Sequence, residues 1–502
     1  MAEPLRVLFI PFFVPSHINP MTDLACAFAS RGVDVTVAVT PANGALIRRT
    51  VEQAASAGHR IRILHYPFPA AEVGLAEGIE NLATVHPSEE GKIYKAVDLV
   101  QGTHERLLRE QLPDAVVADI PFHNLTYAAK KLGIPRLTFY PVGAFSVVVM
   151  GRLEEHKPHA GLAKGDNTPF LVPDIPDNLE IVQSELPNFL RIHDHHAENS
   201  DQIRKSSREC FGVILNSFYD LEPAYCDELV GRDARRGFFL GPYPLWSEKD
   251  DVEKAKVEDD GKCLAWLDTQ ESRSVVFVGF GSFKCFSKEQ HWEMARGLEA
   301  SGRPFLWALK EKNLPGDTAA WLPEGFEDRI RGKGLVVRGW VPQVGILNHP
   351  ATGAFVTHLG WSSLMEGLIA GVPMITWPLA YDQFLSERLV LNVLRVGVRM
   401  WDGYRSSLPE EAADAVVNAE AISRVVSRFL PPGSADEELE AVRKRAAEYR
   451  PRTRTAVKEG GAAYNDLTRL IDSLKAFSPE AEWGDSAAIS TPYLGFLTAS
   501  PA

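Results

Sequence analysis

Cysteine is scarce and unpatterned in this sequence. Among 502 residues there are five cysteines, an odd number, and no two of them have Cys-x-x-Cys spacing. Disulfide frameworks and structural zinc sites need cysteines paired at short, regular intervals. The sequence therefore argues against both kinds of crosslink and indicates a protein of a reducing compartment.

An excess of basic charge is also absent. The formal net charge is −13 at pH 7, whereas a surface that binds nucleic acid needs clustered lysine and arginine to meet the phosphate backbone. We therefore expect no nucleic-acid partner.

Long hydrophobic runs are missing as well. The longest, around residues 137–150, is interrupted by Pro141 and is too short to span a bilayer. An apolar run at residues 7–15 leads into Ser-His-Ile-Asn rather than a small-residue cleavage site, so it predicts a buried strand and not a signal peptide. The expectation is a cytoplasmic protein without a membrane span.

What is present is a strand–helix–strand pattern that opens each half of the chain. Continuous aliphatic runs indicate strands covered on both faces, and apolar positions with helical period indicate helices. The predicted elements are strand 6–10, helix 20–32 and strand 33–39, and later strand 274–280, helix 288–301 and strand 304–309. Continued alternation of strands and helices indicates βαβ units. The predicted fold class is α/β, with two facing, doubly wound, Rossmann-like domains.

A charged segment separates the two predicted domains. Residues 247–261 are dense in Asp, Glu and Lys, which is typical of a linker. The first domain then covers 1–246 and the second 262–455. Residues 477–502 are rich in Ser, Ala and Pro without a period, and they predict a disordered tail. A cleft lined by the carboxyl ends of both sheets would bind the ligands.

Polar side chains gather at the predicted turns within residues 340–383. Residues 358–363 end a strand and open a helix, whose free N–H groups and dipole make a seat for phosphate. Gly360 lets the backbone approach closely, and the hydroxyls of the two serines that follow can cap the helix or donate to an anion. Glu366, one turn further, can accept from ribose hydroxyls, and Trp340 offers a flat face to a base.

This segment resembles the signature box of plant-type family 1 UDP-dependent glycosyltransferases across its full span. The family pattern begins with Trp-x-Pro-Gln, continues with His-Cys-Gly-Trp-Asn-Ser and ends with Asp-Gln. The matching residues of this chain are Trp340, Pro342, Gln343, His349, Gly353, His358, Gly360, Trp361, Ser363, Glu366, Gly371, Pro373, Pro378, Asp382 and Gln383. The resemblance implies the GT-B fold, with an acceptor-binding domain, a donor-binding domain and a C-terminal helix at 456–476 that crosses back to the first domain.

The resemblance also implies the residues of the donor site. From the uracil to the sugar they would be Trp340, Val341, Gln343, Glu366, His358, Gly360, Ser362, Ser363, Ser282, Trp361, Asp382 and Gln383. Trp340 would stack on uracil, Glu366 would hold the ribose, and Ser282 would add a hydroxyl at the diphosphate. A terminal Gln383 resembles members that use glucose. UDP-glucose or another UDP-sugar would be the co-substrate, with no permanently bound cofactor and no metal.

Four positions depart from the family pattern. Leu359 replaces Cys, which predicts a packing exchange, and Ser16 replaces the Gly before the conserved His. Pro141 stands where many members carry a hydroxyl that touches the donor. Ser362 replaces Asn and shortens the reach towards the phosphate. A serine here also occurs in some members that extend existing glycosides, so the class of acceptor stays open.

His17 and Asp119 form the predicted catalytic pair. His17 follows one predicted buried strand and Asp119 ends another, so both should lie at the cleft end of the first sheet. An imidazole is the natural base for an acceptor hydroxyl near pH 7, and a carboxylate behind it fixes its tautomer. Both residues match the family's dyad, which implies a single displacement with inversion at the sugar. Taken alone, His17 is equally well explained as a histidine at a strand end with a hydrogen bond to the helix.

Metal-binding patterns are few. The chain has no Asp-x-Asp pair of the kind that bridges a metal to a diphosphate. The cluster at residues 193–196 has three histidines and an aspartate and could in principle hold a metal, but the interpretation we favour is a solvated loop. We expect a metal-independent enzyme that acts as a monomer.

The acceptor is the least predictable ligand. Aromatic residues that could form an apolar wall for a planar phenol are Phe13, Phe122, Tyr140, Phe145 and Phe189. Several of them are equally well explained as core residues.

Three functions remain open. The leading hypothesis is glucosylation of a hydroxyl on a small lipophilic, phenolic or flavonoid-like acceptor in plant secondary metabolism. A second is extension of an existing glycoside, or formation of a C-glycoside. A third, from a different class, is a catalytically degenerate UDP-sugar-binding protein, which the presence of both His17 and Asp119 argues against.

Overall fold

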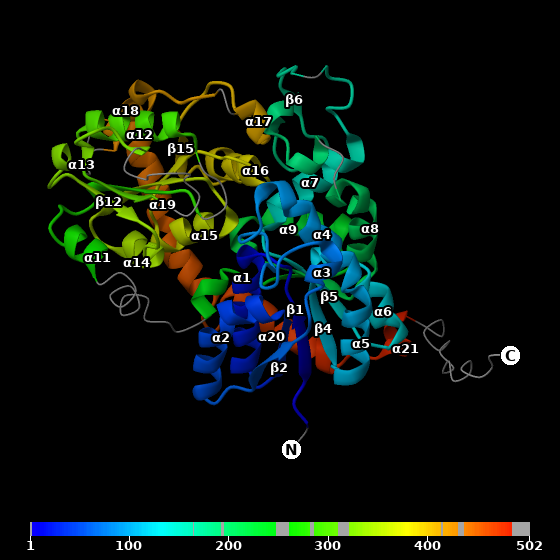
Figure 1. Ribbon diagram of the computed structural model, residues 1–502. Helices are drawn as coiled ribbons and strands as arrows, with labels where there is room; N and C mark the ends of the chain where they lie inside the picture. Colours follow the sequence, from blue (N-terminus) through cyan, green and yellow to red (C-terminus); the bar gives the residue numbers. More distant parts are fainter. Residues whose placement is uncertain are drawn as a thin grey trace.

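Two parallel sheets form the framework of the protein. The computed structural model describes residues 3–163, 165–191, 195–246, 261–281, 286–309, 321–412, 415–429 and 436–483. One sheet has seven strands in the order β3-β2-β1-β4-β5-β8-β9, and the other has six in the order β12-β11-β10-β13-β14-β15. All neighbouring strands in both sheets are parallel. Figure 1 shows the two sheets in separate lobes with helices on both faces, which confirms the predicted fold class.

The first lobe is built from the following elements: β1 (Arg6–Ile10), α1 (Pro15–Ser30), β2 (Asp34–Val39), α2 (Pro41–Ser56), β3 (Ile61–His65), α3 (Ala70–Val73), α4 (Glu90–Leu99), α5 (Gln101–Gln111), β4 (Ala115–Asp119), α6 (Leu125–Lys131), β5 (Arg136–Tyr140), α7 (Ala144–His156), β6 (Phe170–Leu171), β7 (Glu180–Ile181), α8 (His195–Glu209), β8 (Gly212–Leu215), α9 (Pro223–Glu228) and β9 (Gly237–Phe239). The short strands β6 and β7 pair antiparallel with each other, apart from the main sheet.

The second lobe and the closing helices follow: α11 (Lys262–Leu267), β10 (Val275–Gly279), α12 (Lys288–Ser301), β11 (Phe305–Leu309), α13 (Phe326–Arg329), β12 (Gly334–Arg338), α14 (Gln343–Asn348), β13 (Thr352–Thr357), α15 (Trp361–Ala370), β14 (Met374–Thr376), α16 (Gln383–Arg388), β15 (Gly397–Arg399), α17 (Pro409–Ala412), α18 (Ala419–Arg428), α19 (Glu437–Ala456), α20 (Ala462–Lys475) and α21 (Pro479–Trp483). The linker predicted at 247–261 lies almost entirely outside the described residues.

Helix α1 begins earlier than predicted. Its first residue is Pro15, and Pro20 lies inside the helix rather than at its start. Proline suits the first helical position because its fixed φ matches the helix and its missing N–H would have no helical partner there. The prediction of a start at Pro20 is therefore wrong. As a consequence His17 lies in the first turn of α1, and residues 11–14 connect this helix to the end of β1.

A single apolar core crosses from one lobe to the other. It includes Phe145 and Phe218 from the first lobe together with Trp361, Leu364 and Leu385 from the second, all of them buried. Burying apolar surface is the main favourable term in association of the two halves. The lobes are therefore packed against each other and not merely tethered.

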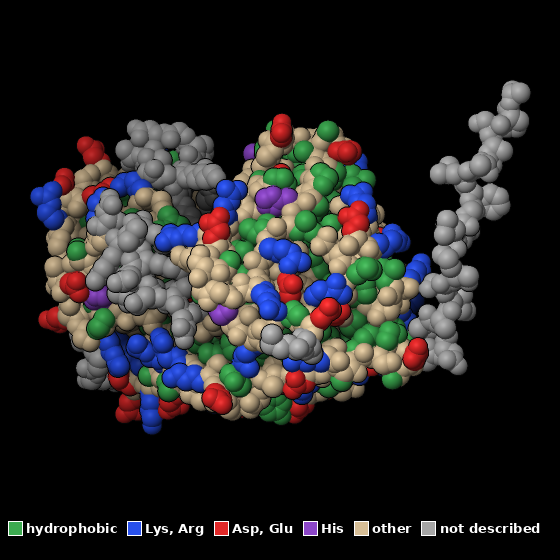
Figure 2. All heavy atoms as spheres, turned by 90° about the horizontal axis from the view of Figure 1, so that it is seen from below, with side chains coloured by type: hydrophobic (Ala, Val, Ile, Leu, Met, Phe, Trp, Pro, Cys, Tyr) green, Lys and Arg blue, Asp and Glu red, His purple; other side chains and the backbone are tan. Residues whose placement is uncertain are grey.

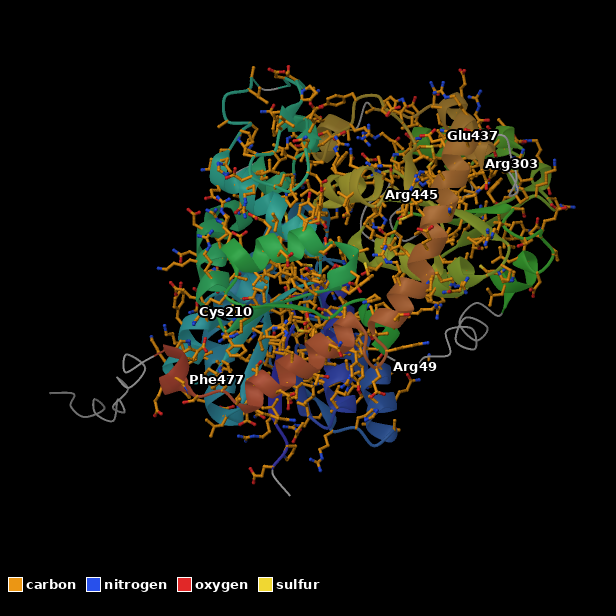
Figure 3. The ribbon with its side chains drawn as sticks, turned by 180° about the vertical axis from the view of Figure 1, so that it is seen from behind. Arg49, Cys210, Arg303, Glu437, Arg445 and Phe477 are labelled. Atoms are coloured by element: carbon orange, nitrogen blue, oxygen red, sulfur yellow. The ribbon has the colours of Figure 1, made fainter. Side chains whose placement is uncertain are left out.

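The last helices return from the second lobe to the first. Figure 3 labels Glu437 and Arg445 on α19, which lies along the second lobe, and the chain then continues across the first lobe to Phe477. Helix α20 buries Leu467 and Leu470 in the same core as Phe9 of β1. The C-terminal part of the chain thus joins the core of the first sheet.

Part of the predicted tail is ordered. Residues 479–483 form α21, where Glu482 accepts hydrogen bonds from both terminal nitrogens of Arg236 at 2.8 and 2.9 Å. The Phe477 ring packs edge-on against Phe211 with centroids 5.7 Å apart. The prediction of disorder from 477 is therefore wrong for residues 477–483, because these side chains find partners on the first lobe that no local pattern reveals. Residues from 484 onward lie outside the described part.

Charges of both signs cover the surface. Figure 2 shows basic and acidic side chains mixed over the face it presents. Such mixing is typical of an ordinary solvated surface rather than of a surface that binds the phosphate backbone of a nucleic acid.

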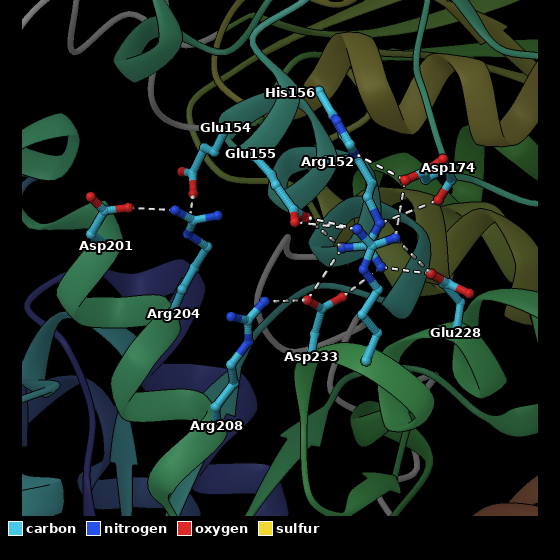
Figure 4. Close-up of polar contacts among 11 residues, drawn as sticks. Arg152, Glu154, Glu155, His156, Asp174, Asp201, Arg204, Arg208, Glu228 and Asp233 are labelled. Atoms are coloured by element: carbon cyan, nitrogen blue, oxygen red, sulfur yellow. Dashed lines mark hydrogen bonds and ion pairs between the residues drawn. The ribbon is translucent and has the colours of Figure 1, made fainter.

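Helix α7 is held in place by a network of ion pairs around Arg152 (Figure 4). The guanidinium of Arg152 is fully buried, and it contacts Glu228 at 2.7 Å and Asp233 at 3.0 Å. Its Nε donates to the carbonyl of Asp174 at 3.2 Å. Since the N-terminus of α7 faces the second lobe, as shown below, this network helps to position one wall of the cleft.

Replacing Arg152 should destabilise the first lobe. In Arg152→Met the carboxylates of Glu228 and Asp233 lose their buried cation and repel each other. We expect the free energy of unfolding to fall by about 3 kcal/mol, the usual cost of removing one partner of a buried ion pair. Chemical denaturation of the variant and the wild type measures the difference, and equal stability would contradict the structural role of Arg152.

Candidate active site

His17 and Asp119 meet at the carboxyl end of the first sheet. Strands β1 and β4 are neighbours, with Ile10 paired to Ala118, so residues far apart in sequence end at the same edge. The Nδ1 atom of His17 lies 3.0 Å from both carboxylate oxygens of Asp119. Asp119 is completely buried, whereas 20% of the His17 side chain is exposed. The structure therefore brings the predicted pair together with the imidazole facing outward.

Backbone donors fix the position of the Asp119 carboxylate. The N–H of Phe12 donates to one oxygen at 3.1 Å, and the N–H of Ile120 donates to the other at 2.9 Å. A carboxylate that accepts from these groups orients His17 so that Nδ1 carries the proton. Nε2 is then the atom that can accept a proton from a ligand.

Aromatic rings surround the imidazole on the side of the first lobe. Phe12 lies edge-on to His17 with centroids 5.6 Å apart, and it stacks on Tyr94 of α4 at 5.7 Å. Phe122 contacts both Phe12 and Phe13 at 6.4 and 5.7 Å. Two of the predicted acceptor residues, Phe13 and Phe122, thus belong to the cluster next to His17. Tyr94 was missed because nothing in its local sequence distinguishes it.

The other predicted acceptor residues lie elsewhere. Phe145 is fully buried and packs on Tyr225 at 4.8 Å. The hydroxyl of Tyr140 is bonded to Ser207 at 2.8 Å. Phe189 is partly exposed in a 3₁₀ turn. The structure places Tyr140 and Phe145 in the core, where their side chains already have partners.

The second lobe presents the start of α15 at its own cleft edge. Gly360 is the N-cap residue, and the first helical bond runs from the N–H of Leu364 to its carbonyl at 3.1 Å. The N–H groups of Trp361, Ser362 and Ser363 therefore precede the first intrahelical bond. Ser362 and Ser363 lie inside the first turn and do not cap the helix. Such a helix start can bind an anion.

Two glycines allow the histidine of this turn to fit. A Cβ atom at Gly281, which has φ +65°, would lie 2.7 Å from the ring of His358, and one at Gly360 would lie 2.6 Å from it. The turns after β10 and β13 therefore close around His358, since these strands are neighbours. Leu359 is fully buried and has φ 64°. Ser282, the predicted hydroxyl beside this turn, lies outside the described residues.

An exposed tryptophan and a hydrogen-bonded amide precede the helix start in the chain. Trp340 is 57% exposed, which is unusual for so large an apolar side chain. The amide nitrogen of Gln343 donates to Ser363 at 3.1 Å and to Glu366 at 2.6 Å. The predicted nucleoside residue Gln343 is thus bonded to the predicted ribose residue Glu366. Val341, next to Trp340 in the chain, is buried.

Asp382 and Gln383 come from the loop after β14. The carbonyl oxygen of Gln383 accepts from the N–H groups of Leu379 and Ala380 at 2.8 and 3.0 Å, so its NH₂ group is the one that can reach a ligand. The Oδ2 atom of Asp382 is buried and makes no hydrogen bond within the described residues. A buried oxygen without a donor is costly, and a sugar hydroxyl would satisfy it.

Asp382 interacts electrostatically with the imidazole of the other lobe. Burial raises the pKa of Asp382, while a backbone hydrogen bond and the charge of His17 across the cleft oppose the rise. Next to it, Tyr381 has φ 55° and lies against Glu90 and Tyr94 of α4; burial first, and then these two groups, raise the pKa of its hydroxyl. Neither Glu90 nor Tyr381 was predicted from the sequence, because their contact exists only when the lobes meet.

Trp361 joins the two lobes. Its indole N–H donates to the carbonyl of Asn216 at 2.8 Å. A Cβ atom at Gly143 would lie 2.3 Å from the Trp361 ring and 2.3 Å from Glu222 Oε1. Glu222 in turn accepts from the N–H groups of Ala144 and Phe145, both at 2.8 Å. The side chain predicted to touch the sugar is thus committed to the interface, where it packs against the start of α7.

Metal ligands do not gather in the described part of the chain. No group of three His, Cys, Asp or Glu side chains there is arranged to hold a metal ion. The histidine cluster at 193–196 lies outside the residues whose side chains are described. None of the described helices combines the length and apolarity needed to cross a membrane.

Known proteins of similar sequence match nearly the whole chain. A family model described as UDP-glucoronosyl and UDP-glucosyl transferase matches residues 234–418. The anthocyanin 3'-O-beta-glucosyltransferase of Gentiana triflora is 39% identical, covering 95% of this chain and 99% of that protein. The scopoletin glucosyltransferase of Nicotiana tabacum is 36% identical over 94% of this chain and 98% of its own length.

A solved structure has the same fold. The crystal structure of UGT73P12 from Glycyrrhiza uralensis, complexed with glycyrrhetinic acid 3-O-monoglucuronide, superposes with a TM-score of 0.86. It is 33% identical, and the match covers 97% of this chain and 98% of that one. Both lobes and their arrangement are therefore shared.

A methyl group at Gly143 should disturb the contact between the lobes. In Gly143→Ala the new Cβ would overlap Trp361 and Glu222, so one of them must move. Overpacking of this kind costs about 1 to 3 kcal/mol. We expect a lower melting temperature, and Trp361→Phe in the same chain should recover part of the loss because it removes ring atoms from the overlap.

The matched control is Gly151→Ala in the same helix. A Cβ at Gly151 meets no atom within 4 Å, and alanine favours the helix, so this variant should be at least as stable as the wild type. Equal melting temperatures for Gly143→Ala and Gly151→Ala would contradict the close approach of Trp361.

Proposed function

This chain belongs to the UDP-glucoronosyl and UDP-glucosyl transferase family, and from that premise we propose that it glucosylates a hydroxyl of a small, lipophilic, phenolic acceptor. As a family member it is a UDP-glycosyltransferase that takes a UDP-sugar as co-substrate. The names of two relatives give an anthocyanin and scopoletin as acceptors, and both are phenols. We further propose that the enzyme acts as a monomer in the cytoplasm.

The approach of His17 to Asp382 carries this proposal. His17 lies on the first lobe and Asp382 on the second, and the charge of His17 opposes the rise that burial causes in the pKa of Asp382. If Asp382 and Gln383 bind the transferred sugar, the imidazole stands beside the carbon at which the new bond forms. General-base catalysis needs this proximity before any adjustment of proton affinity.

The reaction is a single displacement. Nε2 of His17 takes the proton of the acceptor hydroxyl while that oxygen attacks the anomeric carbon of the sugar. The bond from this carbon to the diphosphate oxygen breaks as the new bond forms, and UDP leaves with the electron pair. Attack from the opposite side inverts the configuration, so an α-linked donor gives a β-linked product. Asp119 stabilises the imidazolium that results.

The donor would lie along the second lobe. Trp340 would stack on the uracil, and Glu366 would accept from the ribose hydroxyls. The first-turn N–H groups of α15, with His358, Ser362 and Ser363, would bind the diphosphate and stabilise the charge that develops on it. Glucose is the sugar we propose, because both relatives named above are glucosyltransferases.

Extension of an existing glycoside is the second candidate. Ser362 occupies the position where the family has Asn, and serine occurs there in some members that elongate glycosides. The structural neighbour with a TM-score of 0.86 holds a monoglucuronide, which is itself a glycoside. Mass spectrometry of products from free phenols and from their glucosides, each with several UDP-sugars, separates the two candidates.

His17→Ala should abolish transfer and spare nucleotide binding. Loss of a general base typically lowers turnover about 10²- to 10⁴-fold. We expect kcat with UDP-glucose and a phenol to fall by this amount, while the affinity for UDP, measured by calorimetry, stays within about twofold of the wild type because His17 lies on the other lobe.

His156→Ala is the matched control. His156 also pairs with a carboxylate, Asp174, at 3.2 Å, but it lies at the far end of α7. This variant should keep the wild-type kcat. Turnover retained by His17→Ala, or lost equally in both variants, would remove His17 from the mechanism.

Glu366→Ala should weaken donor binding. A hydrogen bond to a charged group contributes about 1.5 to 3 kcal/mol, so the KM for UDP-glucose should rise about 10- to 100-fold with a smaller change in kcat. Calorimetry with UDP and with uracil tells the ribose contact from a general loss of structure, since only UDP carries the ribose. An unaltered donor KM would contradict the role of Glu366.

A further inference from the structure

Arg136 is a buried cation without an ion-pair partner. It opens β5, only 2% of it is exposed, and it is among the largest fully buried side chains in the described residues. Buried arginines usually meet a carboxylate, because an uncompensated charge is costly away from water. The described part of the chain places no carboxylate within 4.0 Å of this guanidinium.

All hydrogen-bond acceptors of Arg136 are neutral oxygens. Nη1 donates to the hydroxyls of Thr126, Thr138 and Ser206 at 2.7, 2.8 and 3.0 Å. Nη2 reaches the carbonyls of Ala118 and Asp119 at 3.4 and 3.3 Å. The guanidinium thus contacts the carbonyls of the last two residues of β4. None of these contacts supplies a negative charge that would neutralise it.

The carboxylate that belongs to these contacts is that of Asp119, whose own backbone carbonyl accepts from Nη2 at 3.3 Å. Burial lowers the pKa of Arg136, and Cys210, Tyr140 and Asp119 oppose this effect. Asp119 is itself completely buried and is held by the N–H groups of two loop residues on the cleft side. The Arg136 guanidinium and the Asp119 carboxylate therefore both lie at the end of β4. Because both groups are buried, the low dielectric around them leaves their attraction weakly screened.

We propose that Arg136 is a positioning residue for the reaction, whose buried cation balances Asp119 and thereby sets the pH range in which His17 can accept a proton. This inference rests on the proposed roles of His17 and Asp119. Arg136 touches neither the imidazole nor a substrate in this scheme. It acts through the carboxylate and through the carbonyls that fix the end of β4.

The direction of the effect follows from the charges that face the pair. On the second lobe, Asp382 interacts electrostatically with His17. Within the first lobe, burial and, after it, the charge of Asp119 raise the pKa of Tyr243 well above its usual value. Arg136 is the cation in this set. Its removal leaves the pair in a more negative field, so the pair binds a proton more tightly, whichever member carries it.

The cleanest test neutralises Arg136 without removing it. In Thr138→Asp a carboxylate replaces the hydroxyl that accepts from Nη1 at 2.8 Å. The new carboxylate has the buried Arg136 guanidinium as its partner, and this pairing favours folding of the variant. Thr138→Asn is the control of equal size without charge. We expect the acidic limb of the kcat/KM profile to move upward by about one pH unit in Thr138→Asp and to stay in place in Thr138→Asn.

Direct replacement provides the second arm. Arg136→Met should shift the acidic limb in the same direction, and Arg136→Lys, which keeps the charge, should restore it even where stability is lower. Arg152→Met is the matched control for loss of a buried arginine, because Arg152 is surrounded by carboxylates on another side of the lobe. It should lose stability without any shift of the pH profile.

The outcomes are separable from those of the proposed function. His17→Ala decides whether the imidazole is the base. If that variant is inactive while Thr138→Asp and any folded Arg136→Met keep the wild-type pH profile, the role of Arg136 is overturned and the function stands. If Thr138→Asp does not fold, the acidic limb of the kcat/KM profile is compared between Arg136→Met and Arg136→Lys instead. An upward shift in Arg136→Met alone supports the role of Arg136, and equal profiles overturn it.

Discussion

The site depends on the contact between the two lobes, and Trp361 is the side chain at its centre. Its indole donates to the carbonyl of Asn216 and its ring lies where any side chain at Gly143 would have to be. In each sheet the strands are parallel, so their carboxyl ends meet at one edge. The apolar core shared by the two lobes holds these two edges close to each other. Without that contact, His17 and Asp382 would belong to two unrelated surfaces.

Local patterns were enough to predict the framework and much of the site. Aliphatic runs predict strands such as β10. Apolar positions with helical period predict α12, and its predicted bounds, 288–301, are those observed. The turn chemistry around His358 predicted the helix start, because glycines and small polar residues have a local reason to be there. His17 and Asp119 were predictable since parallel strands that are neighbours end together.

The remainder of the site arises from tertiary contacts that leave no local pattern. The Tyr381 contact with α4 and the docking of α21 on Arg236 each join segments distant in sequence. The start of α1 was misjudged because proline marks helix starts, and the chain offers two prolines, Pro15 and Pro20, within one stretch. Trp361 was assigned by its motif, whereas its side chain is used for packing between lobes.

Two buried arginines show how differently one residue type can act in the same lobe. Arg152 is surrounded by carboxylates and stabilises α7 (Figure 4), while Arg136 is surrounded by neutral oxygens and leaves its charge to act on Asp119. The central claim remains that the donor sugar lies between Asp382 and His17. A crystal structure with a non-transferable UDP-sugar analogue tests it most directly. We predict a sugar hydroxyl within hydrogen-bond distance of Asp382 Oδ2 and the anomeric carbon facing His17 Nε2. A sugar bound away from the imidazole would contradict the proposed position of the donor.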